Sequence, residues 1–240
     1  MNLILYRIAA LLIPCLALSV TSASAKEGER RFAIGSYDEL AVDGDIIVDL
    51  ITGSAATATA KGELRDLDRV QIERTGSKLK VRMVRPLSGG KMTAPVRIGL
   101  TSHELDTVSL RGGGQVSISR LSGSTMKVNL QGAGTVRIGK VEGVALGVSL
   151  VGNGRVEIGG GRADAARVEV NGAGSVEAPS LMVETLKLYH LGPASTRIGA
   201  KRTAEIYNNG AGEIAITGKP QCFIRAAGSG DILCGKQAGH

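Results

Sequence analysis

Apolar and polar residues alternate along residues 106–235, and the alternation repeats about every twenty residues. A short glycine element marks each copy, as in RGGGQVSI, QGAGTVRI and VGNGRVEI. The leading glycines lie 20 residues apart four times and then 18 residues apart twice: Gly112, Gly132, Gly152, Gly172, Gly192, Gly210 and Gly228. Seven copies in one register indicate a repeat protein in which every copy builds the same structural unit.

Apolar columns flank each glycine element, with mostly polar residues between them. The first column after the element is Val116, Val136, Val156, Val176, Thr196, Ile214 and Ile232. The second, two residues later, is Ile118, Ile138, Ile158, Ala178, Ile198, Ile216 and Cys234. The column just before the element is Leu110, Leu130, Leu150, Val170, His190, Asn208 and Ala226. Such period-two alternation predicts two strands per copy, each burying one face.

These strands predict an all-β fold, a parallel β-solenoid whose rungs turn at the glycine elements. Glycine suits a tight corner because it reaches positive φ without strain, and one rung buries its apolar face only by stacking on the next. An up-and-down barrel is the rival fold, but hairpins do not require the same residues every twenty positions. Crossover chirality favours a right-handed coil.

The domain is expected to span residues 26–240, with regular rungs over 106–235 and a less regular β part over 32–105. This opening part predicts either the first rungs and cap of the solenoid or a small fused β lobe. Within it, Glu63 to Val70 predicts one helical turn.

Residues 1–25 read as a secretory signal peptide rather than as part of the fold. Arg7 precedes an apolar run from Ile8 to Val20, and Ala23-Ser24-Ala25 supplies the small residues of a cleavage site. The alternative, a membrane anchor, needs roughly 20 apolar residues. We therefore expect export to the periplasm or cell surface, and no transmembrane segment in the mature chain.

Charge and aromatic content argue against nucleic acid as a partner. The chain carries 29 Lys and Arg against 22 Asp and Glu, and the charges are spread out rather than clustered. Nucleic-acid binders concentrate basic residues and interleave aromatics, whereas this sequence has no Trp, four Tyr and two Phe. Weak attraction to anionic cell-surface polymers is compatible with this charge.

Two cysteines remain in the predicted mature chain, Cys222 and Cys234. An even number in an exported protein favours a disulfide, which would pin the C-terminal end of the solenoid. Both residues fall in inward-facing columns, so we expect both sulfur atoms in the core of the last rung. The alternative is a pair of buried free thiols.

One local break in the columns is a possible recognition patch. His190 and Asn208 interrupt an otherwise apolar inward column, and Tyr189 and Tyr207 occupy the outward column beside it. Two stacked tyrosines with polar groups nearby could bind a ligand. The alternative is a loosened corner whose polar side chains hydrogen-bond to each other or to the backbone.

Catalysis, metal and cofactor binding find little support. Glu157 and Glu177 lie on adjacent rungs, where a carboxylate pair could cleave a polysaccharide, but Arg137 and Arg197 flank them as in a charge-balanced ladder. In the column directly after the glycine elements, Asp231 is the only aspartate, so no set of carboxylates that could bind calcium is expected. No metal, cofactor or catalytic residue is therefore predicted.

The sequence also resembles the head GIN domain family of autotransporter adhesin-like proteins, a domain of unknown function. The resemblance runs from about Ile34 to Gly235. It rests on LAVDGDIIVDLITG, LKVRM, VRIGLTSHELDTVSLRGGGQVSI and the glycine ladder that ends in GSGDILCG. It implies an exported all-β solenoid with an adhesive role, and it brings no catalytic residues. LGPAST departs from the ladder, since Ala194 replaces the second glycine.

The function expected from these observations is a non-catalytic, adhesin-like binding module for a surface polymer or an envelope protein. An envelope structural or assembly protein with weak self-association is the alternative, and a polysaccharide-active enzyme is a third.

Overall fold

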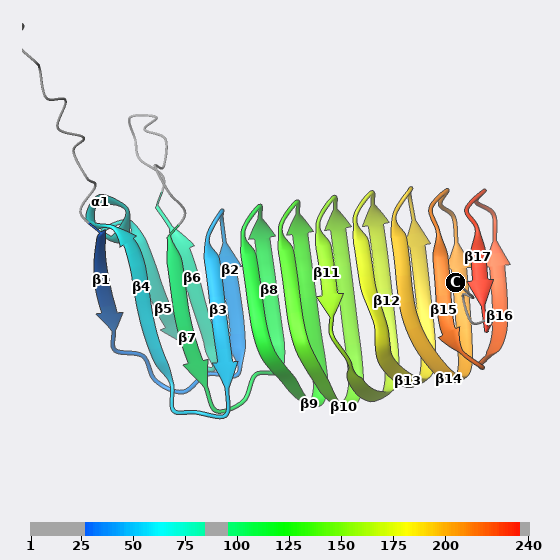
Figure 1. Ribbon diagram of the computed structural model, residues 1–240, viewed down its shortest axis with the longest axis horizontal. Helices are drawn as coiled ribbons and strands as arrows, with labels where there is room; N and C mark the ends of the chain where they lie inside the picture. The colour runs from blue at the N-terminus through cyan, green and yellow to red at the C-terminus, as the bar shows by residue number, and fades with distance from the viewer. Residues whose placement is uncertain (1–26, 85–95, 236–240) are drawn as a thin grey trace, which may run out of the picture.

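The computed structural model describes residues 27–84 and 96–235, and the predicted signal peptide lies outside these residues. Figure 1 shows a straight rod in which strands stack side by side along the long axis. The fold is the predicted all-β parallel solenoid, with about 6 turns and a less regular N-terminal β region. Apart from one short helix, the described elements are strands joined in one continuous sheet.

The regular rungs are built from long strands that bend around the core. In chain order they are β8 (Thr107–Gly112), β9 (Gln115–Gly132), β10 (Thr135–Gly152), β11 (Arg155–Ile158), β12 (Gly161–Gly172), β13 (Ser175–Leu191), β14 (Ser195–Asn208), β15 (Ile214–Gly218), β16 (Gln221–Ala226) and β17 (Ile232–Cys234). At least two short strands per copy were expected, but β9 and β10 run unbroken through the bend opposite the glycine corner. Strand pairing there continues from Lys140↔Arg120 to Gly143↔Gly123.

Stacking in register confirms the predicted columns. Val136 pairs with Val116 on one side and Val156 on the other, and all three side chains are buried. Because the parallel pairing keeps a shift of one repeat, each apolar side chain covers the same side chain of the preceding rung. The core is therefore a set of aliphatic ladders parallel to the rod axis.

The N-terminal part supplies two rungs and a cap, but its rungs are not stacked in chain order. Its strands are β1 (Glu27–Phe32), β2 (Glu39–Asp43), β3 (Ile47–Thr52), β4 (Thr57–Glu63), β5 (Val70–Thr75), β6 (Lys78–Met83) and β7 (Arg97–Ser102). The rung β2–β3 pairs in parallel with β8 and β9 on one side and with β6 and β7 on the other. The first rung in chain order, β2–β3, therefore lies inside the rod, and the next rung, β6–β7, stacks on its outer side.

Antiparallel strands close this end. β4 pairs with β7, β1 with β4 and β5 with β6, and the expected helical turn is α1 (Leu64–Leu67), which contacts β1 and β4. The outermost strand β1, of sequence EGERRF, is almost entirely charged or exposed. A charged edge discourages pairing with other chains, so this end is protected.

The leading glycines lie at the corners between strands, and their backbone conformation differs from the expected one at two positions. Five leading glycines have φ between +98° and +128°: Gly112, Gly132, Gly152, Gly172 and Gly192. Gly210 and Gly228 do not have positive φ, contrary to expectation. A Cβ at these two positions would instead lie against the backbone of the preceding corner, so close approach requires glycine there.

Ala194 replaces a corner glycine at the rung where the residue beneath it is smaller than leucine. At the equivalent positions Gly154 and Gly174, an added Cβ would lie within 2.7 Å of the carbonyl oxygen of the preceding corner. It would also lie 2.7 and 2.6 Å from the Cδ2 atom of a leucine in the preceding rung. Beneath Ala194 that leucine column contains Val170, which is shorter. Ala194 is fully buried, and Gly192 keeps its positive φ.

The polar break in the ladder leaves buried groups without partners. Among the described residues, the side-chain atoms His190 Nε2, Thr196 Oγ1 and Asn208 Nδ2 are buried without a hydrogen-bond partner. His190 and Thr196 flank one corner, and Asn208 stacks on His190 in the next rung. An unsatisfied buried polar group costs stability.

Replacing Thr196 by valine, the residue found at this position in the four preceding rungs, is expected to stabilise the protein. The change keeps the side-chain volume and removes a hydroxyl without a partner, so the free energy of unfolding should rise by about 1–2 kcal/mol. Urea unfolding followed by circular dichroism measures it. The matched control, Thr135→Val on the outer surface, should stay within about 0.5 kcal/mol. A loss of stability in Thr196→Val would show that the hydroxyl has a partner.

Candidate functional site

Two tyrosines stack on the outer face of the sheet formed by β12, β13, β14 and β16. The register places Tyr189 opposite Tyr207, and their ring centroids lie 4.8 Å apart with an angle of 4° between the ring planes. This spacing is that of adjacent strands, so the backbone ladder itself sets the stack. The predicted stacking of the two side chains is thus present in the structure.

An arginine covers each end of the stack. The Cζ atom of Arg167 lies 4.3 Å from the Tyr189 ring centroid, and that of Arg225 lies 5.5 Å from the Tyr207 centroid. Such cation–π contacts are attractive because the ring face is electronegative. We define Arg167, Tyr189, Tyr207 and Arg225 as the arginine–tyrosine stack. With both outer faces covered, the stack offers ring edges, hydroxyl groups and guanidinium groups to a partner, not ring faces.

The two arginines differ in how far they are neutralised. A hydrogen bond from Arg167 to Glu169, with a second contact to the Tyr189 hydroxyl group, holds the pKa of the Arg167 guanidinium above its ordinary value. No ion pair within the described parts of the chain involves Arg225, which is exposed. Arg225 is therefore the member of the stack that retains a charge for a partner.

Exposed apolar side chains surround the stack. Phe223 lies in the column next to Tyr207 and is 50% exposed, while Leu191 and Val151 lie on the opposite side of the tyrosine column. Two shallow hollows, of about 280 and 220 Å³, border Tyr189 and Tyr207. Sequence reasoning missed Arg167, Arg225 and Phe223. Arg225 could have been found, since it directly follows Tyr207 in the same column.

His190 and Asn208, the other two members of the predicted patch, point into the core and are fully buried. His190 Nδ1 lies 3.1 Å from Asn208 Oδ1, which also accepts a hydrogen bond of 2.9 Å from the backbone N–H of Gly210. Because Asn208 Oδ1 acts as the acceptor, His190 Nδ1 carries the proton. These side chains tie the corner together and do not reach the outer face.

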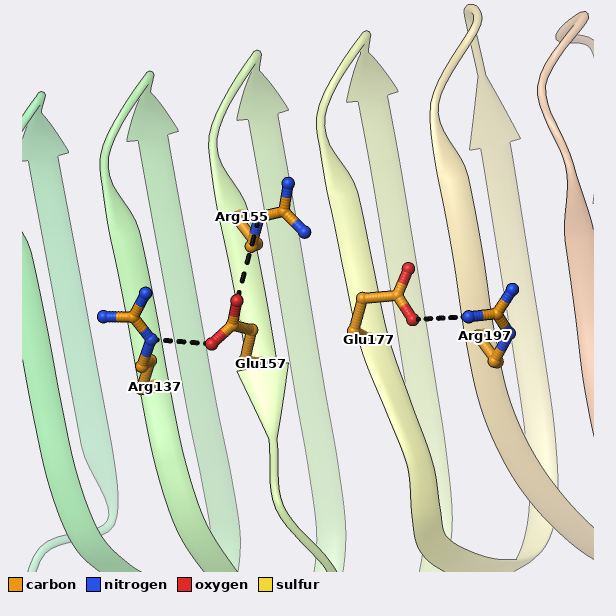
Figure 2. A network of polar contacts seen from close by, with 5 residues as sticks. All are labelled: Arg137, Arg155, Glu157, Glu177 and Arg197. Carbon is orange, nitrogen blue, oxygen red and sulfur yellow. Dashed lines mark hydrogen bonds and ion pairs between the residues drawn. The ribbon is translucent and has the colours of Figure 1, made fainter.

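The two stacked carboxylates on the opposite face are each held by arginine. Figure 2 shows Glu157 and Glu177 pointing in opposite directions, the former to Arg137 and the latter to Arg197. The shortest N···O distances are 2.7 Å for Glu157 and 3.2 Å for Glu177. A retaining glycosidase needs two carboxyl groups that face one bond from opposite sides. The geometry instead matches the charge-balanced ladder.

Cys222 and Cys234 form a disulfide with an Sγ–Sγ distance of 2.01 Å and a Cα–Cα distance of 6.4 Å. It crosses the interior of the last rung and joins β16 to β17. Both residues continue the inward columns, and Cys234 packs against the core, but both are only half-buried. The reason is that, within the described residues, no further rung covers them.

The described residues show neither a membrane-spanning helix nor a metal site. No helix over residues 27–84 and 96–235 is long and apolar enough to cross a bilayer. Within the same ranges, no three His, Cys, Asp or Glu side chains gather closely enough to hold a metal ion.

Comparison with known proteins gives the fold and the family. A crystal structure of a "putative adhesin" from Bacteroides fragilis is 21% identical, with a TM-score of 0.76 over 88% of this chain and 97% of that one. A "putative lipid binding protein" from Parabacteroides distasonis is 22% identical, with a TM-score of 0.65 over 88% and 97%. A "putative adhesin" from the same species is 16% identical, with a TM-score of 0.68 over 87% and 97%.

No curated protein matches the sequence. The likeness to the solved structures concerns the fold alone, whereas the family rests on a match to its sequence profile. That profile, described as "Putative auto-transporter adhesin, head GIN domain", matches residues 36–220. The resemblance seen in the glycine ladder is therefore confirmed, and the chain belongs to the head GIN domain family.

Proposed function

We propose that the protein is an exported, non-catalytic adhesin-like module that binds a cell-surface polymer or an envelope protein through the arginine–tyrosine stack. The observation that carries the proposal is the stack itself, since tyrosine and arginine are among the residues enriched where binding energy is concentrated. Phe223 and Leu191 extend it with exposed apolar surface.

The shape of the surface supports an extended partner rather than a small molecule. The hollows beside the stack are shallow, and small-molecule sites are usually clefts of about 300–1,000 Å³ that enclose most of the ligand. A flat face with a repeat of about 4.8 Å suits a chain-like or protein partner lying along the rod. Family membership supports export and an adhesive role.

Replacing Tyr189 and Tyr207 by alanine is expected to weaken binding at least tenfold, because two central aromatic anchors are lost. Binding is measured on a glycan array and on immobilised envelope extract. The variant Tyr189→Phe with Tyr207→Phe keeps the stack and removes only the hydroxyl groups, so it separates stacking from hydrogen bonding. The control is Arg137→Ala with Glu157→Ala on the opposite face.

Equal binding by the wild type and the double alanine variant would refute the site. If binding is lost in the control variant instead, the binding site lies on the opposite face, at the charged residues that include Arg137 and Glu157. Thermal unfolding of each variant ensures that a lost contact is not mistaken for a lost fold.

A further inference from the structure

The outermost strands at the two ends of the rod differ in charge and in how far other elements cover their edges. At the N-terminal end, the outermost strand β1 carries four charged residues among six, and α1 packs against it. At the C-terminal end, β16 has the sequence QCFIRA and β17 the sequence ILC, with Arg225 as the single charge in both strands. In the described chain, β16 pairs only with β14 and β17 only with β15, so one edge of each strand is open.

Apolar side chains are exposed at this open end because nothing in the described chain covers the last rung. Ile224 is 47% exposed, although Ile206, its neighbour in the same inward column, is fully buried. Phe223 and Leu233 add outward-facing apolar surface, at 50% and 46% exposed. Natural edges usually carry charges, proline or a covering segment to prevent strand pairing. Within β16 and β17, such protection is limited to the charge of Arg225 and the short length of β17, so the edge of β16 is open to strand pairing.

The last rung is symmetric about its corner, and this makes it complementary to a second copy of itself. Phe223 lies five residues before Gly228, and Leu233 lies five residues after it. The disulfide joins Cys222 and Cys234, which lie six residues on either side, so the two strands are level across the core. One axis perpendicular to the rod can therefore pass through Phe223 on β16 and Leu233 on β17.

A two-fold rotation about this axis pairs each edge strand antiparallel with its own copy. On β16, Phe223 meets Phe223 of the second copy, Cys222 meets Ile224, and Gln221 meets Arg225. On β17, Leu233 meets Leu233, and Ile232 meets Cys234. Side chains that point inward in one copy pair with inward side chains of the other. The two Arg225 side chains do not lie opposite each other, and the two Phe223 rings form a pair at the axis. Aromatic pairs and the avoidance of like charges both favour such cross-strand contacts.

We propose that this protein forms a tail-to-tail, two-fold symmetric dimer in which the open edges of β16 and β17 continue both sheets into a second copy. Such an isologous contact closes on itself and leaves no further edge for growth. The end of one rung is small, roughly 20 Å by 10 Å, so the interface is below the standard of about 800 Å² per partner and association should be weak. The proposal does not depend on the binding role of the arginine–tyrosine stack.

Analytical ultracentrifugation over a series of protein concentrations tests the dimer without any ligand. The wild type should show a monomer–dimer equilibrium. Phe223→Asp, which places two like charges together on the axis, should raise the dissociation constant at least tenfold. Val144→Asp is the matched control, because Val144 is equally exposed, at 53%, but lies on the bend far from the last rung. A monomer at every concentration, or a dimer that persists in Phe223→Asp, overturns the proposal.

A cysteine at the axis provides an independent readout. Directly opposed residues in an antiparallel pair have Cα atoms about 4.5–5.5 Å apart, within disulfide range. Phe223→Cys should therefore yield a covalent dimer under mild oxidation, whereas Val144→Cys should not. Peptide mass spectrometry should find the intermolecular disulfide between the two introduced sulfur atoms, with the native bond from Cys222 to Cys234 intact.

Failure of Phe223→Cys to cross-link at concentrations where the wild type dimerises would place the contact elsewhere. Both the sedimentation and the cross-linking readouts stand even if no surface partner binds the stack.

Discussion

Replacing Gly152 by alanine is expected to lower the free energy of unfolding by about 3 kcal/mol. Gly152 has φ of +116°, a conformation that costs any L-residue with a side chain about 1–2 kcal/mol. The added Cβ would also lie 2.6 Å from the carbonyl oxygen of Gly132 in the preceding rung. Because rungs are stacked on both sides, the corner cannot move away without separating two ladders. Urea unfolding followed by circular dichroism measures the loss.

Gly147 is the matched control for this experiment. It lies in the same strand, β10, but does not have positive φ, and an added Cβ would lie 3.8 Å from the nearest atom, the carbonyl oxygen of Met126. Gly147→Ala is therefore expected to be neutral, or to stabilise by up to about 1 kcal/mol through the unfolded state. A loss below about 1 kcal/mol in Gly152→Ala, or equal losses at both positions, would show that the corners do not require glycine.

Removing the disulfide is expected to cost about 3 kcal/mol, the chain-entropy value for a loop of this size. Cys222 and Cys234 are 12 residues apart, and their bond holds the two strands that have no rung beyond them in the described chain. The double variant Cys222→Ala with Cys234→Ala avoids leaving a free thiol. Its effect should be concentrated in residues 221–234, where faster amide hydrogen exchange is expected while the exchange of β9 and β10 changes little.

Chemical reduction separates the bond from the side chains. Adding a thiol reductant to the wild type should lower its unfolding midpoint to about that of the double variant, and the double variant itself should not respond. If hydrogen exchange accelerated evenly along the rod, the disulfide would be stabilising the whole ladder rather than its open end. If reduction had no effect, the last rung would be held by its strand pairing alone.

The recognition patch shows where sequence reasoning reached its limit. The alternation placed Tyr189 and Tyr207 outward and His190 and Asn208 inward, and the structure has both arrangements. It did not find Arg167, whose column lies two residues away from that of the tyrosines, because only the side-chain conformation brings its guanidinium over the Tyr189 ring. The sequence also could not predict that the Glu157 and Glu177 side chains point in opposite directions. A shared column predicts that two residues are neighbours, but it does not predict their side-chain rotamers.

The sequence by itself determined the rungs, their inward columns and the glycine corners from Gly112 onward, because burial and turn geometry are local properties that recur in every copy. Only the tertiary structure decided that β2 and β3 lie between β6–β7 and β8–β9, and that the last rung leaves Cys222 and Cys234 half-buried. The physical reason is that strand order and end exposure depend on contacts between segments far apart in the chain. A period of two residues carries no information about which strand lies next to which.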